Sequence, residues 1–104
     1  MKNNFGLLDA DLQIIIAVLK QFATVEKATI FGSRAKGTYK KGSDIDIALI
    51  GAQLNFDTIS QISYRLNEET QLPYQLDILN YHTIIEPALK EHIDRAGIVV
   101  YENV

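Results

Sequence analysis

One segment near the middle of the chain limits the possible folds most. Residues 44–50 read Asp-Ile-Asp-Ile-Ala-Leu-Ile, so the segment begins with strict polar–apolar alternation and then becomes apolar on both faces. Alternation with a period of two predicts a β-strand, and a continuous apolar run is typical of a strand buried deep in a sheet. We therefore expect a sheet that contains this strand, with two aspartates on one face at its start.

The rest of the chain supplies helices and strands in alternation. Apolar residues recur at helical spacing in three segments, and short β-branched or aromatic runs indicate three further strands. With a short helix after the first strand, the order is α-β-(short α)-β-α-β-α-β, which predicts an α/β (α+β) domain with helices packed on a small mixed sheet. The expected helices lie at about 12–23, 56–67 and 86–96, and the expected strands at 28–31, 44–50, 74–80 and 98–101.

Length and charge narrow the classes of function. A chain of 104 residues allows one domain, residues 1–104, and leaves little material for a second. Ten Lys and Arg against thirteen Asp and Glu give a net charge of -3, which argues against nucleic acid as the main partner, because such a partner attracts a basic surface. The sequence has no cysteine for disulfides, and no apolar run approaches the ~20 residues that cross a bilayer. We expect a cytoplasmic protein without a membrane partner.

Three aspartates lie inside or at the start of otherwise apolar segments. Asp44 and Asp46 share one face of their strand, roughly 6.6 Å apart along it. Asp77 belongs to another predicted strand and would join them if the two strands were neighbours. Carboxylate oxygens are the ligands that Mg²⁺ prefers, and three carboxylates suit a two-metal phosphoryl-transfer site. The hypothesis is that Asp44 and Asp46 bind the metals, and that Asp77 binds one metal and takes the proton of the attacking hydroxyl.

A glycine–serine pair follows the strand predicted at 28–31. Gly32 has no Cβ, so its backbone can approach a phosphate closely. If Ser33 begins a short helix, its hydroxyl and the neighbouring N–H groups would face the anion. Arg34 and Lys36 lie in the basic loop that follows and would neutralise phosphate charge. These residues predict a phosphate-binding turn.

Each of these features also has a simpler explanation. Alternating acids often form the solvated face of an edge strand, and a Gly-Ser pair is often only a turn. Their joint occurrence on three segments is what argues for a shared site. Three other polar or aromatic residues receive ordinary interpretations: His82 as a surface residue of a turn, His92 as a structural residue beside the inward Ile93, and Tyr39 as packing on its own loop.

Together the motifs resemble those of a known family. Gly32-Ser33, a ten-residue spacer and the string Asp-Ile-Asp-Ile are similar to the signature of the nucleotidyltransferase superfamily related to DNA polymerase β. The longer string Gly-Ser-Arg-Ala-Lys-Gly resembles the minimal nucleotidyltransferase (MNT) branch. The resemblance implies a palm-like fold, ATP as substrate with its triphosphate at Gly32 and Ser33, and two magnesium ions at the three aspartates. Lys36 stands where this branch commonly has arginine, which keeps the charge but loses the planar fork.

The resemblance also implies a partner. Larger members of the superfamily carry a further domain for the acceptor, and the MNT branch is typically paired with a small helical HEPN protein as a toxin–antitoxin couple. The expected activity is that of an antitoxin that transfers AMP from ATP to a tyrosine of the HEPN toxin within a hetero-oligomer. Two alternatives remain open: an enzyme of the antibiotic nucleotidyltransferase type that acts on a small molecule, and a non-catalytic antitoxin that neutralises its partner by binding.

Overall fold

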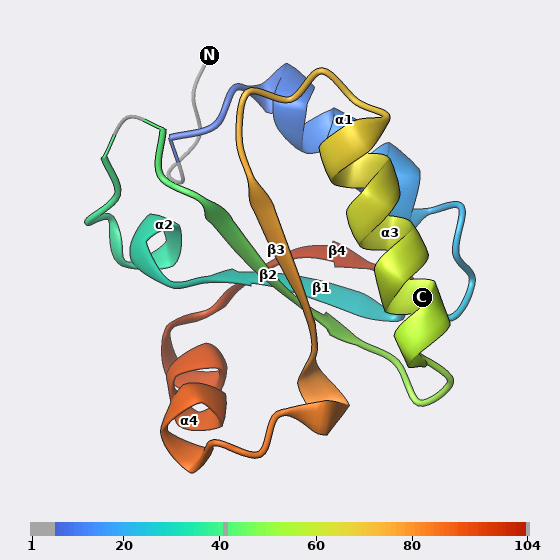
Figure 1. Ribbon diagram of the computed structural model, residues 1–104. Coiled ribbons are helices and arrows are strands. Elements are labelled where there is room, and N and C mark those ends of the chain that lie inside the picture. Colours follow the sequence, from blue (N-terminus) through green and yellow to red (C-terminus); the bar gives the residue numbers. More distant parts are fainter. Residues whose placement is uncertain (1–5, 41, 104) are drawn as a thin grey trace.

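A four-stranded sheet forms the centre of the molecule (Figure 1). In the computed structural model, which describes residues 6–40 and 42–103, the strands are β1 (Lys27–Phe31), β2 (Ile45–Ile50), β3 (Leu76–Asn80) and β4 (Ile98–Glu102). Their order in the sheet is β3-β2-β1-β4. β2 pairs antiparallel with β1 and parallel with β3, and β4 pairs antiparallel with β1. β2 therefore lies inside the sheet, as its apolar sequence predicts.

The helices follow the predicted order. They are α1 (Asp9–Leu19), α2 (Ser33–Lys36), α3 (Phe56–Glu68) and α4 (Pro87–Ala96), with a 3-10 turn η1 (Tyr81–Thr83) after β3. The prediction of an α/β (α+β) fold with a small mixed sheet packed by helices is confirmed. Within residues 6–40 and 42–103, no helix combines the length and the apolar character that crossing a bilayer requires.

The first helix differs from the prediction at its C-terminal end. Its apolar periodicity continues to Phe22, but α1 ends at Leu19. The next backbone N–H groups, those of Gln21 and Phe22, donate to the carbonyls of Val18 and Leu19, three residues back, and so close a tight turn. Phe22 still packs against the core from this turn, which explains why the sequence pattern continues after the helix has stopped.

The side chains of the sheet separate into two cores. Ile45, Ile47 and Leu49 of β2 are fully buried in the larger core, which α1 and α3 complete. Ala48 belongs to the smaller core on the opposite face, where it joins Phe31 of β1 and Ile93 of α4. Because side chains of a strand alternate between faces, Asp46 lies on the face of the smaller core, opposite the isoleucines, as the alternation predicts.

Asn67 of α3 fixes the edge strand that carries the third aspartate. Its amide nitrogen donates to the Leu76 carbonyl at 2.9 Å, and its amide oxygen accepts from the Leu76 N–H at 2.8 Å. The side chain thus bonds to the edge of β3 as a neighbouring strand would. The residue that follows Leu76 is Asp77, so this clamp helps to determine where Asp77 lies.

Candidate active site

The register of the parallel strands brings two acids together. Asp46 of β2 and Asp77 of β3 are partners in the strand pairing, and the charge of the Asp77 carboxylate acts on Asp46. Asp44 immediately precedes β2, and its charge also acts on Asp46. Asp44 and Asp77 are exposed, whereas Asp46 is partly buried. Two of the three predicted carboxylates therefore lie side by side on paired strands, and the charge of the third acts on the same residue.

The electrostatics of this group suit a divalent cation. Partial burial raises the pKa of Asp46 to about 6, and the Asp77 and Asp44 carboxylates add to the rise. Such repulsion is relieved when a cation lies between the carboxylates, and carboxylate oxygens are the ligands that Mg²⁺ prefers. Across residues 6–40 and 42–103, however, no group of three or more His, Cys, Asp or Glu side chains is arranged to hold a metal ion. The chemistry of the donors fits, and the three-carboxylate metal site remains a prediction.

The glycine–serine turn lies directly against these acids. Gly32 has φ 75° and ψ −151°, a backbone conformation open essentially to glycine alone. A Cβ at Gly32 would collide with Oδ2 of Asp46. Ser33 begins α2, as the sequence suggests. Gly32 and Asp46, fourteen residues apart in sequence, therefore lie in one candidate site.

His92 of α4 also contacts the turn, which sequence reasoning missed. The Gly32 N–H donates to Nε2 of His92 at 3.0 Å. The imidazole packs edge-on against Phe31, with ring centroids 6.1 Å apart. In the sequence, a histidine beside the inward Ile93 gives no sign of the turn that it meets sixty residues earlier. His82, interpreted as a surface residue, is exposed and accepts the Gly51 N–H at 3.1 Å.

Arg34 bonds to the protein itself. Only 2% of it is exposed, and its guanidinium donates to the Ser43 carbonyl through Nε at 3.3 Å and Nη2 at 2.8 Å. The rings of Tyr39 and Tyr74 flank it, 5.1 and 4.9 Å from Cζ. Arg34 thereby ties α2 to the residue before Asp44. Phosphate binding by Arg34 and by Lys36 remains a prediction.

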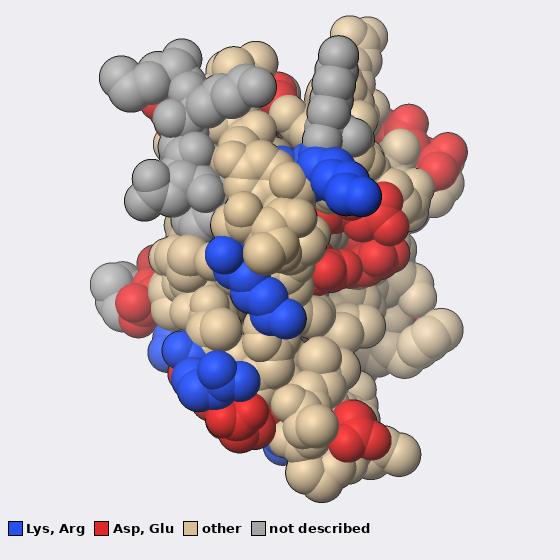
Figure 2. Space-filling model, turned by 90° about the vertical axis from the view of Figure 1, so that its left-hand side faces the viewer, with Lys and Arg blue, Asp and Glu red and all other residues tan. Residues whose placement is uncertain are grey.

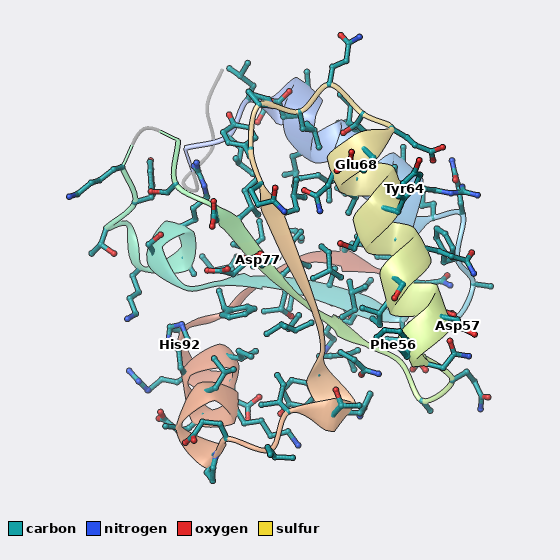
Figure 3. The ribbon with its side chains drawn as sticks, viewed as in Figure 1. Phe56, Asp57, Tyr64, Glu68, Asp77 and His92 are labelled. Atoms are coloured by element: carbon teal, nitrogen blue, oxygen red, sulfur yellow. The ribbon has the colours of Figure 1, made fainter. Side chains whose placement is uncertain are left out.

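The side of the molecule that carries α2 and α4 shows a charged surface. Figure 2 looks onto this side, where acidic side chains gather in a group with Lys or Arg side chains beside them. Figure 3 shows Asp77 on β3 and His92 on the side of α4 that faces α2. The acids, the turn and α4 therefore belong to one face of the molecule.

A comparison with protein families shows the family to which the chain belongs. The model described as "Polymerase beta, Nucleotidyltransferase" matches residues 13–104. The chain belongs to this nucleotidyltransferase family. It is 32% identical to a Haemophilus influenzae protein named "Probable protein adenylyltransferase MntA", over 96% of this chain and 90% of that protein.

Solved structures resemble this nucleotidyltransferase in fold. A crystal structure of a toxin–antitoxin with AMP-PNP superposes with a TM-score of 0.72 at 21% identity, over 92% of this chain and 75% of that chain. A complex of the tri-AMPylated Shewanella oneidensis HEPN toxin with an MNT antitoxin gives a TM-score of 0.68 at 19% identity, over 90% and 71%. The predicted nucleotidyltransferase fold is confirmed.

The geometry of the nucleotidyltransferase site indicates what it can accept. Asp44 and Asp77 are exposed, so the acidic group opens to solvent. The carboxylates offer the oxygen ligands that a divalent cation prefers, and the turn beside them leaves its glycine backbone without a Cβ.

Proposed function

We propose that this nucleotidyltransferase transfers AMP from ATP to a tyrosine of a small HEPN-type protein and thereby acts as an antitoxin. The observation that carries the proposal is the pairing of Asp46 with Asp77 across β2 and β3, beside the Gly32 turn. The Haemophilus influenzae relative, named an adenylyltransferase, supports AMP as the transferred group. The Shewanella oneidensis complex, whose HEPN toxin is tri-AMPylated, supports a HEPN protein as the acceptor and a hetero-oligomer as the assembly.

The residues of the site take separate roles in this proposal. Asp44, Asp46 and Asp77 would hold two magnesium ions, which when bound neutralise phosphate charge and stabilise the attacking and leaving oxygens. Gly32 and Ser33 bind the triphosphate of ATP through the close approach of their backbone. Lys36, exposed at the end of α2, adds positive charge beside them.

The transfer exchanges one phosphorus–oxygen bond for another. A bond forms between the tyrosine oxygen and the α-phosphorus of ATP. The bond from the α-phosphorus to the oxygen that bridges to the β-phosphorus breaks, and pyrophosphate leaves with that electron pair. Asp77 takes the proton of the attacking hydroxyl, because it is exposed on an edge strand where an acceptor can approach.

The test is AMP transfer to the cognate HEPN protein, measured with ATP labelled on the α-phosphate and Mg²⁺. The double variant Asp46→Asn with Asp77→Asn removes the charge that holds the cations, and we expect label transfer to fall by about 100-fold or more. Asp57→Asn changes an exposed aspartate of α3 (Figure 3) and is the matched control, which should transfer label as the wild type does.

Three results would contradict the proposal in different ways. Undiminished transfer by the double variant would exclude the assigned carboxylates. Neutralisation of the HEPN protein by wild type that transfers no label would establish the binding-only alternative. Label on a small molecule in place of the HEPN protein would establish the antibiotic-type alternative.

A further inference from the structure

We propose that His92 is a positioning residue of this site: its imidazole holds the Gly32 N–H and thereby fixes the Gly32–Ser33 turn in the geometry that the triphosphate requires. The inference rests on the proposed function for the ligand of the turn. The contact itself is independent of that function, because it joins two groups of the chain.

The position of the imidazole is fixed by two contacts of the ring and by the packing of its helix. Nε2 accepts the Gly32 N–H at 3.0 Å. The ring meets Phe31 edge-on, with an interplanar angle of 71°. The next residue of α4, Ile93, is 3% exposed and anchors the helix in the smaller core. The helix, the strand end and the turn are therefore held together at one imidazole.

Gly32 is held from opposite sides by these contacts. Its N–H donates to His92, and its carbonyl accepts from the Lys36 N–H at 3.1 Å. On a third side, the space that a Cβ would need is occupied by Oδ2 of Asp46. Both polar backbone groups of the glycine are thus bonded, and its distance from the carboxylate is set by those bonds.

Without the imidazole, the Gly32 N–H would need another hydrogen-bond acceptor. A partly buried N–H without an acceptor is costly, and the closest carboxylate to this residue is that of Asp46. A rotation of the turn toward Asp46 would satisfy the N–H but would occupy a carboxylate oxygen that the proposed function assigns to a cation. His92 keeps the amide on the other side, which leaves the carboxylate available.

The chain contains a matched bond outside the site. His82 accepts the Gly51 N–H through Nε2 at 3.1 Å, which is the same donor and acceptor chemistry. Gly51 follows β2 at the end opposite Asp44, and it is five residues from Asp46, roughly 16 Å along the strand. A purely structural role of a histidine–glycine bond should therefore appear equally at His82 and His92.

The experiment compares His92→Gln, His92→Asn and His82→Asn in the full chain. Glutamine places Oε1 as many bonds from Cα as the Nε2 of histidine, so it keeps the acceptor, whereas asparagine is too short. With Mg²⁺ and an ATP analogue that cannot transfer AMP, calorimetry should show the dissociation constant rising about tenfold in His92→Asn, as expected for one lost hydrogen bond. The constant should stay within about threefold of wild type in His92→Gln and in His82→Asn.

A second measurement examines the contact without nucleotide. In the wild type, nitrogen NMR should show Nε2 of His92 unprotonated, and the Gly32 amide resonance should shift in His92→Asn but far less in His92→Gln. In the transfer assay, KM for ATP should rise more than kcat falls in His92→Asn, because the loss lies in the binding of the triphosphate.

The outcomes separate this inference from the proposed function. Analogue binding by His92→Asn equal to that of wild type would overturn the positioning role alone. An equal loss of affinity in His82→Asn would also overturn it, because the effect would then be one of general stability. Wild type that neither binds the analogue nor transfers AMP would contradict the proposed function, and the positioning role with it.

Discussion

Gly32 is the residue at which the two halves of the site meet. Its backbone has a positive φ, and Oδ2 of Asp46 occupies the place of the missing side chain. Gly37, five residues later, also has a positive φ but has open space where a Cβ would lie. The two glycines therefore separate two requirements: a left-handed backbone, which both need, and a close approach to the carboxylate, which Gly32 alone of this pair needs.

We predict different outcomes for alanine at these two glycines. Gly37→Ala should cost about 1 kcal/mol of stability for its left-handed backbone, lower the Tm by roughly 5 °C and leave AMP transfer intact. Gly32→Ala should cost more stability and abolish transfer, because the added methyl group displaces Asp46 as well as straining the turn. Thermal unfolding and label transfer measure the two effects. Wild-type transfer by Gly32→Ala would show that the site does not need this close approach.

At the scale of elements, local sequence patterns predicted which helices and strands form, but they did not predict all the contacts between these elements. The alternation in β2 predicts that Asp46 lies on the opposite face from the isoleucines, and in the structure Asp46 lies on that face. The direction of β3 and its register with β2 depend on the crossover through α3, which no local pattern encodes. The contact of His92 with Gly32 was not predicted for the same reason, since it depends on where α4 packs.

Arg34 shows how a long-range contact changes the meaning of a local pattern. A cation in a basic loop is expected to be exposed, but here Tyr39 and Tyr74 enclose the guanidinium, and Tyr74 comes from a distant segment. The bonds to the Ser43 carbonyl use two nitrogens of the planar group. This contact makes α2 and the start of β2 one unit.

We predict that two reciprocal substitutions on α2 differ in their effect on stability. Arg34→Lys loses the paired donors and the stacked plane, so it should lower the free energy of unfolding by about 1–3 kcal/mol. Lys36→Arg, at an exposed residue, should change it by less than about 0.5 kcal/mol and preserve nucleotide affinity. Urea unfolding and calorimetry measure these changes. If Arg34→Lys kept full stability and lost only nucleotide affinity, Arg34 would be a direct phosphate ligand.

At the scale of the whole molecule, the site links ligand binding to folding. Its residues come from the end of β1, from β2, from β3 and from α4, so the unfolded chain cannot assemble it. Burial of Asp46 and repulsion from Asp77 and Asp44 raise its pKa, so its charged form weakens the fold when no cation is bound. Stability and function therefore oppose each other at this residue.

The last prediction concerns the stability of Asp46→Asn with and without metal. The pKa of Asp46 is about 6 in the fold and 3.8 ordinarily. As the pH rises, the unfolded chain therefore loses the Asp46 proton at a lower pH than the folded chain does. The wild type with EDTA should therefore lose stability as the pH rises from about 4 to about 6. After a discount for solvent screening, the loss is about 1 kcal/mol, which corresponds to roughly 5 °C in Tm. Asp46→Asn should lack this loss.

With EDTA at pH 7.5, Asp46→Asn should be the more stable protein. Addition of Mg²⁺ and the ATP analogue should make the wild type the more stable one. A ligand at 100 times its dissociation constant stabilises the fold by about 2.7 kcal/mol. This gain exceeds the loss of stability that the charged Asp46 causes. The wild type at pH 7.5 should then unfold at a higher temperature than Asp46→Asn. Thermal unfolding at pH 4 and 7.5 provides the measurement. If Asp46→Asn were the less stable protein at pH 7.5 with EDTA, Asp46 would be a structural carboxylate, because a residue kept for a cation stabilises the fold only when the cation is bound.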